Sequence, residues 1–406
     1  MKAPALELGD IFRLHGPAYL TTFGASLSRA QKQALKAIAA CRTAALGGYV
    51  EQCDQCGYQK IAYCSCRNRH CPKCHGQATA RWLEQRAAEL LPVEYFHVVF
   101  TVPQLVAPLA LQNQRLVYGI LFRAAAETLL QIAADPRHLG ARLGFLAVLH
   151  TWGQNLHHHP HLHCIVPGGG IAPDHCRWIP CRRQFLFPVK VLSRLFRAKF
   201  VAYLKTAFRD GKLGFHGELK SLGEKRNFVA WLKRLAATEW VVYAKPPFGG
   251  PQQVLKYLAR YTHRVAIANQ RLVSLEDGCV TFRRKNYARP SESATMTLKA
   301  EEFMRRFLLH VLPTGFVKVR HFGFLANRNR RDNLRLCRQL LAVSSITPPG
   351  LAPHDSPTNE AKANTVDRCP RCKVGSMRML EMLVPQAEAS LRYGAISLRV
   401  LQMDTS

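Results

Sequence analysis

The chain has 406 residues and a formal net charge of +31 at neutral pH, from 57 Lys and Arg against 26 Asp and Glu. Hydrophobic residues make up 48% of the sequence, which indicates two or three globular domains. The charge exceeds what solubility requires and predicts a polyanionic partner, with nucleic acid favoured over an anionic membrane surface. Neither a long apolar run nor an apolar signal core is visible, so we expect no membrane partner and a cytoplasmic location.

The N-terminal part of the chain combines helices with clustered cysteines. Residues 8–46 are predicted to be helical, and 7 of the 14 cysteines lie between Cys41 and Cys74. In a cytosolic chain such clustering favours zinc over disulfides. The 14 residues 57–70 separate two Cys-x-x-Cys knuckles, a spacing typical of a zinc ribbon in which each knuckle supplies two thiolates. The predicted ligands of this structural Zn²⁺ are Cys53, Cys56, Cys71 and Cys74.

Further cysteines leave a second zinc site open. The candidates for it are Cys41, Cys64, Cys66 and His70. Their spacing does not decide which of them take part. Near the other end of the chain, Cys369 and Cys372 form a lone knuckle after a linker-like, proline-containing stretch. Because one knuckle cannot complete a tetrahedral zinc site, we interpret residues 346–406 as a linker and a tail.

The middle of the chain alternates between strand and helix patterns, which predicts an α+β domain over residues 93–345 after a helical and zinc-binding domain over residues 1–92. The predicted strands are 95–102, 143–152, 161–166, 240–245 and 316–322, with a hairpin over 271–287 that turns at 276–278. The predicted helices are 78–91, 105–134, 189–208, 228–236 and 299–312, followed by a basic helix or arm at 328–338.

Two histidines flank one apolar residue on a predicted strand, in the segment His161-Leu162-His163. Side chains alternate along a strand, so His161 and His163 point to the same side while Leu162 enters the core. Two imidazoles so placed can hold one metal ion. The alternative is a pair of histidines that are only hydrogen-bonded within the fold.

A tyrosine pair lies on the helix predicted to begin at Gly250-Pro251. Tyr257 and Tyr261 are four residues apart, which puts both phenols on one helix face. A basic flank accompanies them at the same spacing, formed by Lys256, Arg260 and Arg264. The alternative is that the tyrosines pack into a core.

Two other basic groups are candidates for DNA contacts: Arg283, Arg284 and Lys285 on the hairpin, and Arg328, Arg330 and Arg331 on the arm. A solvated surface explains such a run equally well, and only the net charge favours DNA. Paired histidines, a nucleophile-bearing helix and a basic surface together predict metal-assisted cleavage of single-stranded DNA. A tyrosine would attack phosphorus, leaving a 5′-phosphotyrosine and a free 3′-OH.

These motifs together resemble the two-tyrosine rolling-circle transposases of the insertion-sequence ninety-one type, within the HUH endonuclease superfamily. The likeness rests on His161-Leu162-His163, Pro167-Gly168-Gly169-Gly170 and Tyr257-Leu258-Ala259-Arg260-Tyr261-Thr262-His263-Arg264. Cys53 to Cys56 and Ser65 to Cys74 resemble the zinc-binding domain of that family. The resemblance covers about residues 10 to 340.

The resemblance implies a ferredoxin- or RNA-recognition-like antiparallel sheet with the histidines on a central strand. It implies Tyr257 and Tyr261 as nucleophiles, and His161 and His163 as ligands of Mg²⁺ or Mn²⁺ at single-stranded element ends and targets. Relatives usually add a third polar ligand, for which Gln154 and His157 are the candidates.

The same chemistry also fits a plasmid-type replication initiator or relaxase. The charge and the zinc ribbon alone would fit a non-catalytic nucleic-acid-binding protein. The chain contains no Gly-x-x-x-x-Gly-Lys-Ser/Thr loop for ATP. Strand unwinding is therefore expected from a host helicase or the replication machinery, in a bacterial, nucleoid-associated setting.

Overall fold

The structure is a computed structural model that describes residues 6–74, 85–248, 253–254, 266–285, 293–341 and 368–386. The chain divides into two compact units. The larger unit combines residues 1–6, 28–31 and 75–346, and the smaller one combines residues 7–27, 32–74 and 347–406. Tyr257 and Tyr261 lie outside the described residues, as do Lys256, Arg260 and Arg264.

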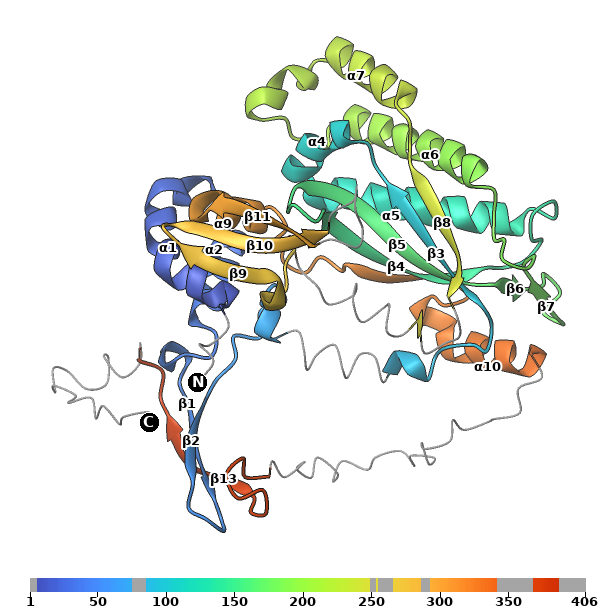
Figure 1. Cartoon of the computed structure of the whole chain (residues 1–406). Coiled ribbons are helices and arrows are strands. Elements are labelled where there is room, and N and C mark those ends of the chain that lie inside the picture. The colour runs from blue at the N-terminus through green and yellow to red at the C-terminus, as the bar shows by residue number, and fades with distance from the viewer. Residues whose placement is uncertain are drawn as a thin grey trace. The chain divides into compact units, whose positions relative to one another are not determined.

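The larger unit is built on a five-stranded antiparallel sheet with the strand order β12-β4-β5-β3-β8 (Figure 1). Its strands are β3 (Tyr95–Thr101), β4 (Gly144–Trp152), β5 (His158–Pro167), β8 (Val242–Phe248) and β12 (Val319–Gly323). Strand β5, which carries the paired histidines, is therefore central. The predicted α+β class with an antiparallel sheet is confirmed.

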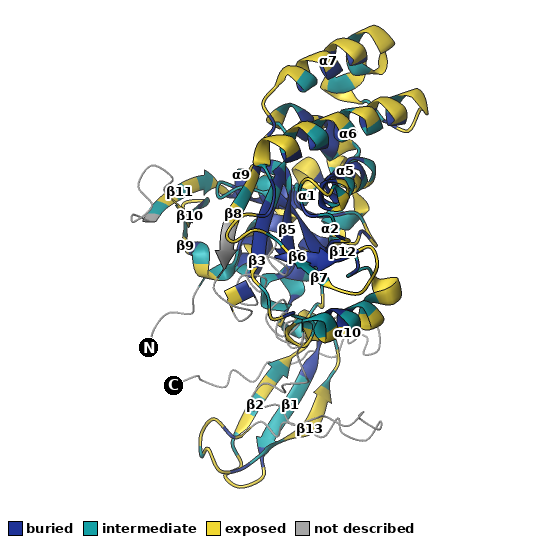
Figure 2. Ribbon diagram, turned by 90° about the vertical axis from the view of Figure 1, so that its right-hand side faces the viewer, coloured by how far each residue is buried: buried dark blue, intermediate teal, exposed yellow. Residues whose placement is uncertain are grey.

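Helices cover one face of this sheet (Figure 1). They are α4 (Ala107–Gln112), α5 (Gln114–Ala134), α6 (Val189–Arg209) and α7 (Lys225–Ala237). Helix α5 is long and apolar enough to cross a membrane, but 67% of its apolar window is buried within the protein, as expected of a core helix. Figure 2 shows buried residues along the strands and exposed ones on the outer sides of α6 and α7.

Alternation along the strands gives the sheet two chemically different faces. The face toward the helices is apolar, with residues such as Phe100, Leu149 and Leu162 fully or almost fully buried in one large core. The opposite face carries the histidines His97, His150, His161 and His163 beside a smaller apolar cluster. Leu162 thus points into the core while its two neighbours point away, as its position between two histidines predicts.

Further elements extend the larger unit. They are β6 (Gly169–Ile171), β7 (Trp178–Pro180), β9 (Leu272–Glu276), β10 (Cys279–Lys285), β11 (Ser293–Lys299), α9 (Ala300–Leu308) and α10 (Arg330–Leu340). The predicted hairpin is confirmed: β9 and β10 pair antiparallel, and Asp277 and Gly278 have the positive φ values of a tight turn. Helix α9 packs on the resulting sheet, with Phe303 against Phe282 at 5.8 Å between ring centroids.

The glycine run after β5 has a packing role. A Cβ atom added at Gly169 would lie 2.5 Å from Trp178 Nε1, and one at Gly170 would lie 2.6 Å from the Arg142 carbonyl oxygen. Neither separation is compatible with a side chain. The run therefore lets β6 approach its neighbours closely at the end of the central strand.

The smaller unit contains residues from both ends of the chain. Its elements are most of α2 (Arg29–Ala40), together with α1 (Leu8–Phe23), β1 (Gly48–Cys53), β2 (Gln59–Tyr63) and β13 (Met377–Leu383). The three strands form an antiparallel sheet in the order β13-β1-β2. The segment interpreted as a tail thus supplies an edge strand, because pairing with β1 satisfies its backbone hydrogen bonds.

A buried histidine near α9 predicts a pH-dependent stability. His310 is 1% exposed, and its Nε2–H donates to the Leu156 carbonyl oxygen while Nδ1 accepts from the Thr151 hydroxyl. Burial lowers the pKa of His310 to about 4. Because the unfolded chain takes up this proton near pH 6.5, stability should fall as the pH drops from about 6.5 toward 4.

We therefore expect the unfolding free energy of a His310→Gln variant to depend less steeply on pH. Between pH 7 and pH 5 the wild-type protein should lose about 2 kcal/mol more than the variant. Urea titrations of both proteins at the two pH values measure this difference. Equal losses in the two proteins would show that His310 does not titrate in this way.

Candidate metal centres and nuclease site

Three imidazoles from two paired strands converge on the histidine face of the sheet. His150 lies in β4, and His161 and His163 lie in β5. The strand register pairs His150 directly with His161 and Val148 with His163. One nitrogen atom of each ring lies within 4.8 Å of the others. Such a group can hold one metal ion through neutral imidazole nitrogens.

Hydrogen bonds orient two of these rings. Nδ1 of His161 lies 2.7 Å from the His159 carbonyl oxygen, which can only accept, so Nδ1 carries the proton and Nε2 keeps a lone pair. Nδ1 of His163 lies 2.8 Å from Nε2 of His97. If His163 donates in that contact, its Nε2 also keeps a lone pair. A polar neighbour behind a ligating histidine is the usual arrangement in metal sites.

Burial keeps these rings neutral at physiological pH. Desolvation lowers the pKa of His161 to about 4 and that of His163 well below its ordinary value. Burial, with the nearby Lys245 charge, lowers the pKa of His97 to about 3. Neutral imidazole is the form that ligates metals, so the electrostatics of the site suit a cation.

The two sequence candidates for a third ligand lie in a neighbouring cavity. Gln154 and His157 line a cavity of about 330 Å³ together with His159 and Arg284. The structure instead brings His150 into the group with His161 and His163. His150 lies on the strand that precedes the histidine strand. Because the register shifts between His150 and Trp152, a count from the Trp152–His158 pair would place Leu149 opposite His161, so the sequence gives no direct signal for His150.

One described residue shortly before the tyrosine pair in the sequence packs on the same face of the sheet. Val254, three residues before Tyr257, is fully buried and packs with Tyr95, Val148 and Ile165. Val148 and Ile165 flank His150 and His163 at the i±2 positions of their strands, which share a face.

Among the described residues, the basic side chains predicted to contact DNA differ in how exposed they are. Arg283 and Lys285 of β10 are exposed, as are Arg328 and Arg331. Arg284 is half-buried and lines the cavity beside His157. Arg330 is also half-buried and forms an ion pair with Glu89, with Nε 3.3 Å from Oε1. The exposed side chains are available to phosphates, whereas Arg330 has a structural partner.

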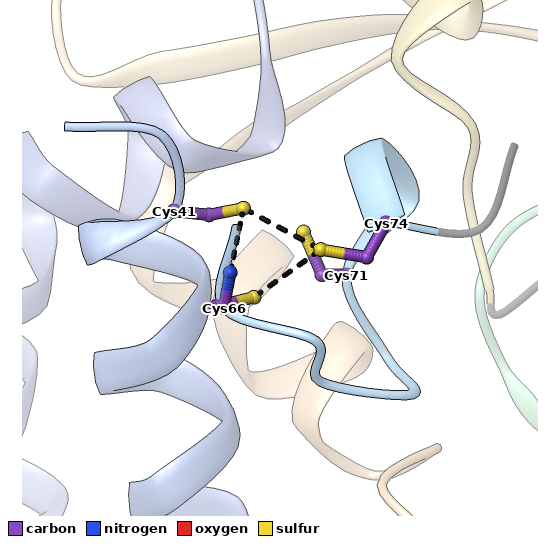
Figure 3. A group of neighbouring side chains, drawn as sticks. All are labelled: Cys41, Cys66, Cys71 and Cys74. Carbon is purple, nitrogen blue, oxygen red and sulfur yellow. Dashed lines mark hydrogen bonds between the residues drawn. The ribbon is translucent and has the colours of Figure 1, made fainter. Parts of the chain in front are cut away.

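The cysteines of the smaller unit form two separate groups of four. The first contains Cys41, Cys66, Cys71 and Cys74 (Figure 3). In it, Sγ of Cys74 lies 3.6 Å from Sγ of both Cys41 and Cys66. Thiolates about 2.3 Å from a tetrahedral zinc ion are about 3.8 Å apart, whereas disulfide sulfurs are about 2.0 Å apart. The geometry therefore fits zinc ligation.

The predicted combination of Cys53 and Cys56 with Cys71 and Cys74 differs from the structure. Cys53 and Cys56 group instead with Cys369 and Cys372. The reason is the β1–β2 hairpin: Gly48 pairs with Tyr63 at its base, and Cys53 ends β1 five residues away. At about 3.3 Å per residue, about 16 Å of strand separates the two knuckles.

Of the four candidates for a second zinc site, two join a cysteine group and two do not. Cys41 and Cys66 join the group that contains Cys71 and Cys74, whereas Cys64 and His70 do not belong to either group of four. Cys64 is exposed, and His70 is buried with Nδ1 3.2 Å from Asn68 Oδ1. The sequence interval between knuckles could not reveal this, because the folded hairpin and not the interval sets the distances.

Comparison with known proteins matches both parts of the chain. Residues 144–333 match a family model described as "Putative transposase", and residues 11–102 match one described as "Transposase zinc-binding domain". These matches define a transposase with a zinc-binding domain before it. No solved structure matches the chain.

Two named transposases are similar to this chain over most of its length. A protein of Sinorhizobium fredii named "Putative transposase y4qJ" is 55% identical over 93% of this chain and 95% of its own length. The "Transposase for insertion sequence element IS801" of Pseudomonas savastanoi pv. phaseolicola is 27% identical over 71% of this chain and 68% of its own length. The chain belongs to the two-tyrosine transposase family of the insertion-sequence ninety-one type, which confirms the resemblance seen in its motifs, and DNA is accordingly its partner.

The first cysteine group predicts that replacing Cys41, but not Cys64, removes a zinc ion from the protein. A Cys41→Ser variant should contain one zinc ion less per chain and should lose folded structure in the smaller unit, because metal binding supplies folding energy there. A Cys64→Ser variant is the matched control and should keep the wild-type zinc content. Elemental analysis of the purified proteins, with limited proteolysis, measures both effects. A loss of zinc in the Cys64→Ser variant alone would show that Cys64, and not Cys41, is the zinc ligand.

Proposed function

We propose that this transposase nicks and rejoins single-stranded DNA at the ends of an insertion element through a 5′-phosphotyrosine intermediate, the chemistry of the HUH endonucleases. The observation that carries the proposal is the convergence of His150, His161 and His163 on the sheet face where Val254 is buried. Tyr257 follows Val254 by three residues in the sequence, which supports the proposal that metal ligands and nucleophiles serve one phosphodiester.

The donor set fits a divalent first-row ion. Three neutral imidazoles suit Mn²⁺ better than Mg²⁺, which prefers oxygen ligands, unless substrate oxygens complete the shell. His150, His161 and His163 would hold the ion. When bound, it would polarise the scissile phosphate as a Lewis acid and orient it.

The tyrosines would supply the covalent step. The phenolic oxygen of Tyr257 or Tyr261 forms a bond to phosphorus, and the bond from phosphorus to the 3′ oxygen breaks. The phenol gives up its proton, and the leaving 3′ oxygen takes one up to become a 3′-OH. One phosphoester replaces another, so attack by a 3′-OH on the phosphotyrosine rejoins DNA without ATP. Two tyrosines allow one site to cut twice.

The cavity next to the histidines would hold the flanking strand. His159, whose carbonyl oxygen orients His161, lines this cavity with Gln154, His157 and Arg284. The exposed cations Arg283, Lys285, Arg328 and Arg331 would contact phosphates. Without an ATP-binding loop in the sequence, strand separation would come from a host helicase or from replication.

The covalent step can be tested with single-stranded oligonucleotides that span either end of the element. With Mn²⁺ or Mg²⁺, the wild-type protein should form an adduct that survives a denaturing gel. A Tyr257→Phe, Tyr261→Phe double variant should form none, because both nucleophiles are absent. The matched control is Tyr243→Phe in β8, a 49% exposed tyrosine on the histidine face of the sheet, which should retain the adduct. An adduct with the double variant would refute the mechanism.

The third ligand can be tested separately. His150→Ala should weaken Mn²⁺ binding by about 100-fold or more and lower nicking in parallel with His161→Ala, since each removes a ligand. His157→Ala and Gln154→Ala should change Mn²⁺ affinity much less, because these side chains line the cavity. Calorimetric Mn²⁺ titration of the four variants makes the comparison. A larger loss with His157→Ala or Gln154→Ala than with His150→Ala would identify one of them as the ligand instead.

A further inference from the structure

The second cysteine group combines two knuckles from opposite ends of the chain. Sγ of Cys53 lies 3.7 Å from Sγ of Cys372, and Sγ of Cys56 lies 3.6 Å from Sγ of Cys369. All four sulfurs lie within 4.8 Å of one another. The separations approach the value of about 3.8 Å expected for four thiolates around zinc, and exceed that of about 2.0 Å for a disulfide.

Backbone amides surround the sulfurs as they do in zinc knuckles. The amides of Gln55 and Cys56 donate to Sγ of Cys53 at 3.4 and 3.5 Å, and the amide of Gly375 donates to Sγ of Cys372 at 3.3 Å. Such bonds stabilise negative charge on sulfur, which is the form that ligates a metal. In both knuckles, backbone amides therefore stabilise a thiolate that can bind a cation.

The two knuckles also fit each other closely. A Cβ atom at Gly375 would lie 2.4 Å from Sγ of Cys53, so only glycine permits this approach. Asp54 and Ser376 exchange two further bonds: the Ser376 amide donates to Asp54 Oδ1 at 2.8 Å, and the Asp54 amide donates to the Ser376 carbonyl oxygen at 3.1 Å. The C-terminal knuckle is therefore a specific partner of the N-terminal one.

Apolar burial contributes little to this part of the unit. Most residues of β13 are exposed, including Met379, Leu380 and Met382, and so is Ile61 of β2. A three-stranded sheet without a buried face needs another source of stability. Four converging thiolates can supply it.

We infer that Cys53, Cys56, Cys369 and Cys372 bind a second structural Zn²⁺, which ties the C-terminal segment of the chain to its N-terminal zinc-binding unit. This site lies partly beyond the matched zinc-binding domain, since that match ends at residue 102. The inference does not depend on the nuclease chemistry. It makes residues 368–386 part of the folded domain.

The test is the zinc content of the wild-type protein, three cysteine variants and one control variant, all of full length. The Cys369→Ser, Cys372→Ser pair should lower it by one ion per chain, and the Cys53→Ser, Cys56→Ser pair should lower it by the same one ion. All four changes together should still remove only one ion, because the pairs share a site. The control is the pair Cys176→Ser, Cys181→Ser, which lies outside both groups and should leave the zinc content unchanged.

Unchanged zinc in the Cys369, Cys372 variant, or a loss of two ions in the fourfold variant, would overturn the inference. Misfolding of a variant is controlled by a measurement on the unmodified protein. With zinc bound, Cys56 and Cys372 should resist alkylation and become reactive only after chelation, whereas the exposed Cys176 should react throughout. Alkylation of Cys56 and Cys372 as fast as Cys176 before chelation would also overturn it.

Discussion

The antiparallel register of β4 and β5 determines the separation of the three imidazoles. Residues directly opposite in such a pair have Cβ atoms about 5 Å apart, and residues two positions along one strand share a face. Pairing His150 with His161 therefore brings His163 to both of them. A shift of one residue would turn the partner of His161 toward the helices. The apolar residues that alternate with the histidines prevent this shift, because they fill the core under α5 and α6.

Burial and positive charge both favour neutral histidines at this site. The chain carries +31 net charges, which attract a polyanion. Withdrawal from water, helped at His97 by the Lys245 charge, keeps His97, His161 and His163 neutral, as the lowered pKa values show. The site thus offers lone pairs within a cationic protein. His97 adds a hydrogen-bond partner behind His163, an arrangement that orients a ligand ring.

The smaller unit buries apolar side chains of α1 and α2, whereas its three-stranded sheet depends on cysteines more than on apolar contacts. Its two groups of four cysteines lie at the two ends of the β1–β2 hairpin. One group joins the end of α2 to the segment after β2, and the other joins the tip of the hairpin to the knuckle before β13. Strand β13 then pairs with β1, so chain ends more than three hundred residues apart form one sheet.

Local patterns in the sequence were sufficient for the strands of the five-stranded sheet, most helices, the Asp277-Gly278 hairpin and the pairing of His161 with His163 on one face, because period and turn chemistry act over a few residues. They did not reveal the short strands β1, β2, β6, β7, β11 and β13. Composition and motifs also indicated the transposase family, zinc and a DNA partner. The tertiary structure alone decided that His150 joins the histidine pair, and that Cys53 and Cys56 meet Cys369 and Cys372 rather than Cys71 and Cys74. Strand register and the length of a hairpin set those distances, and neither is encoded in the spacing of the residues that meet.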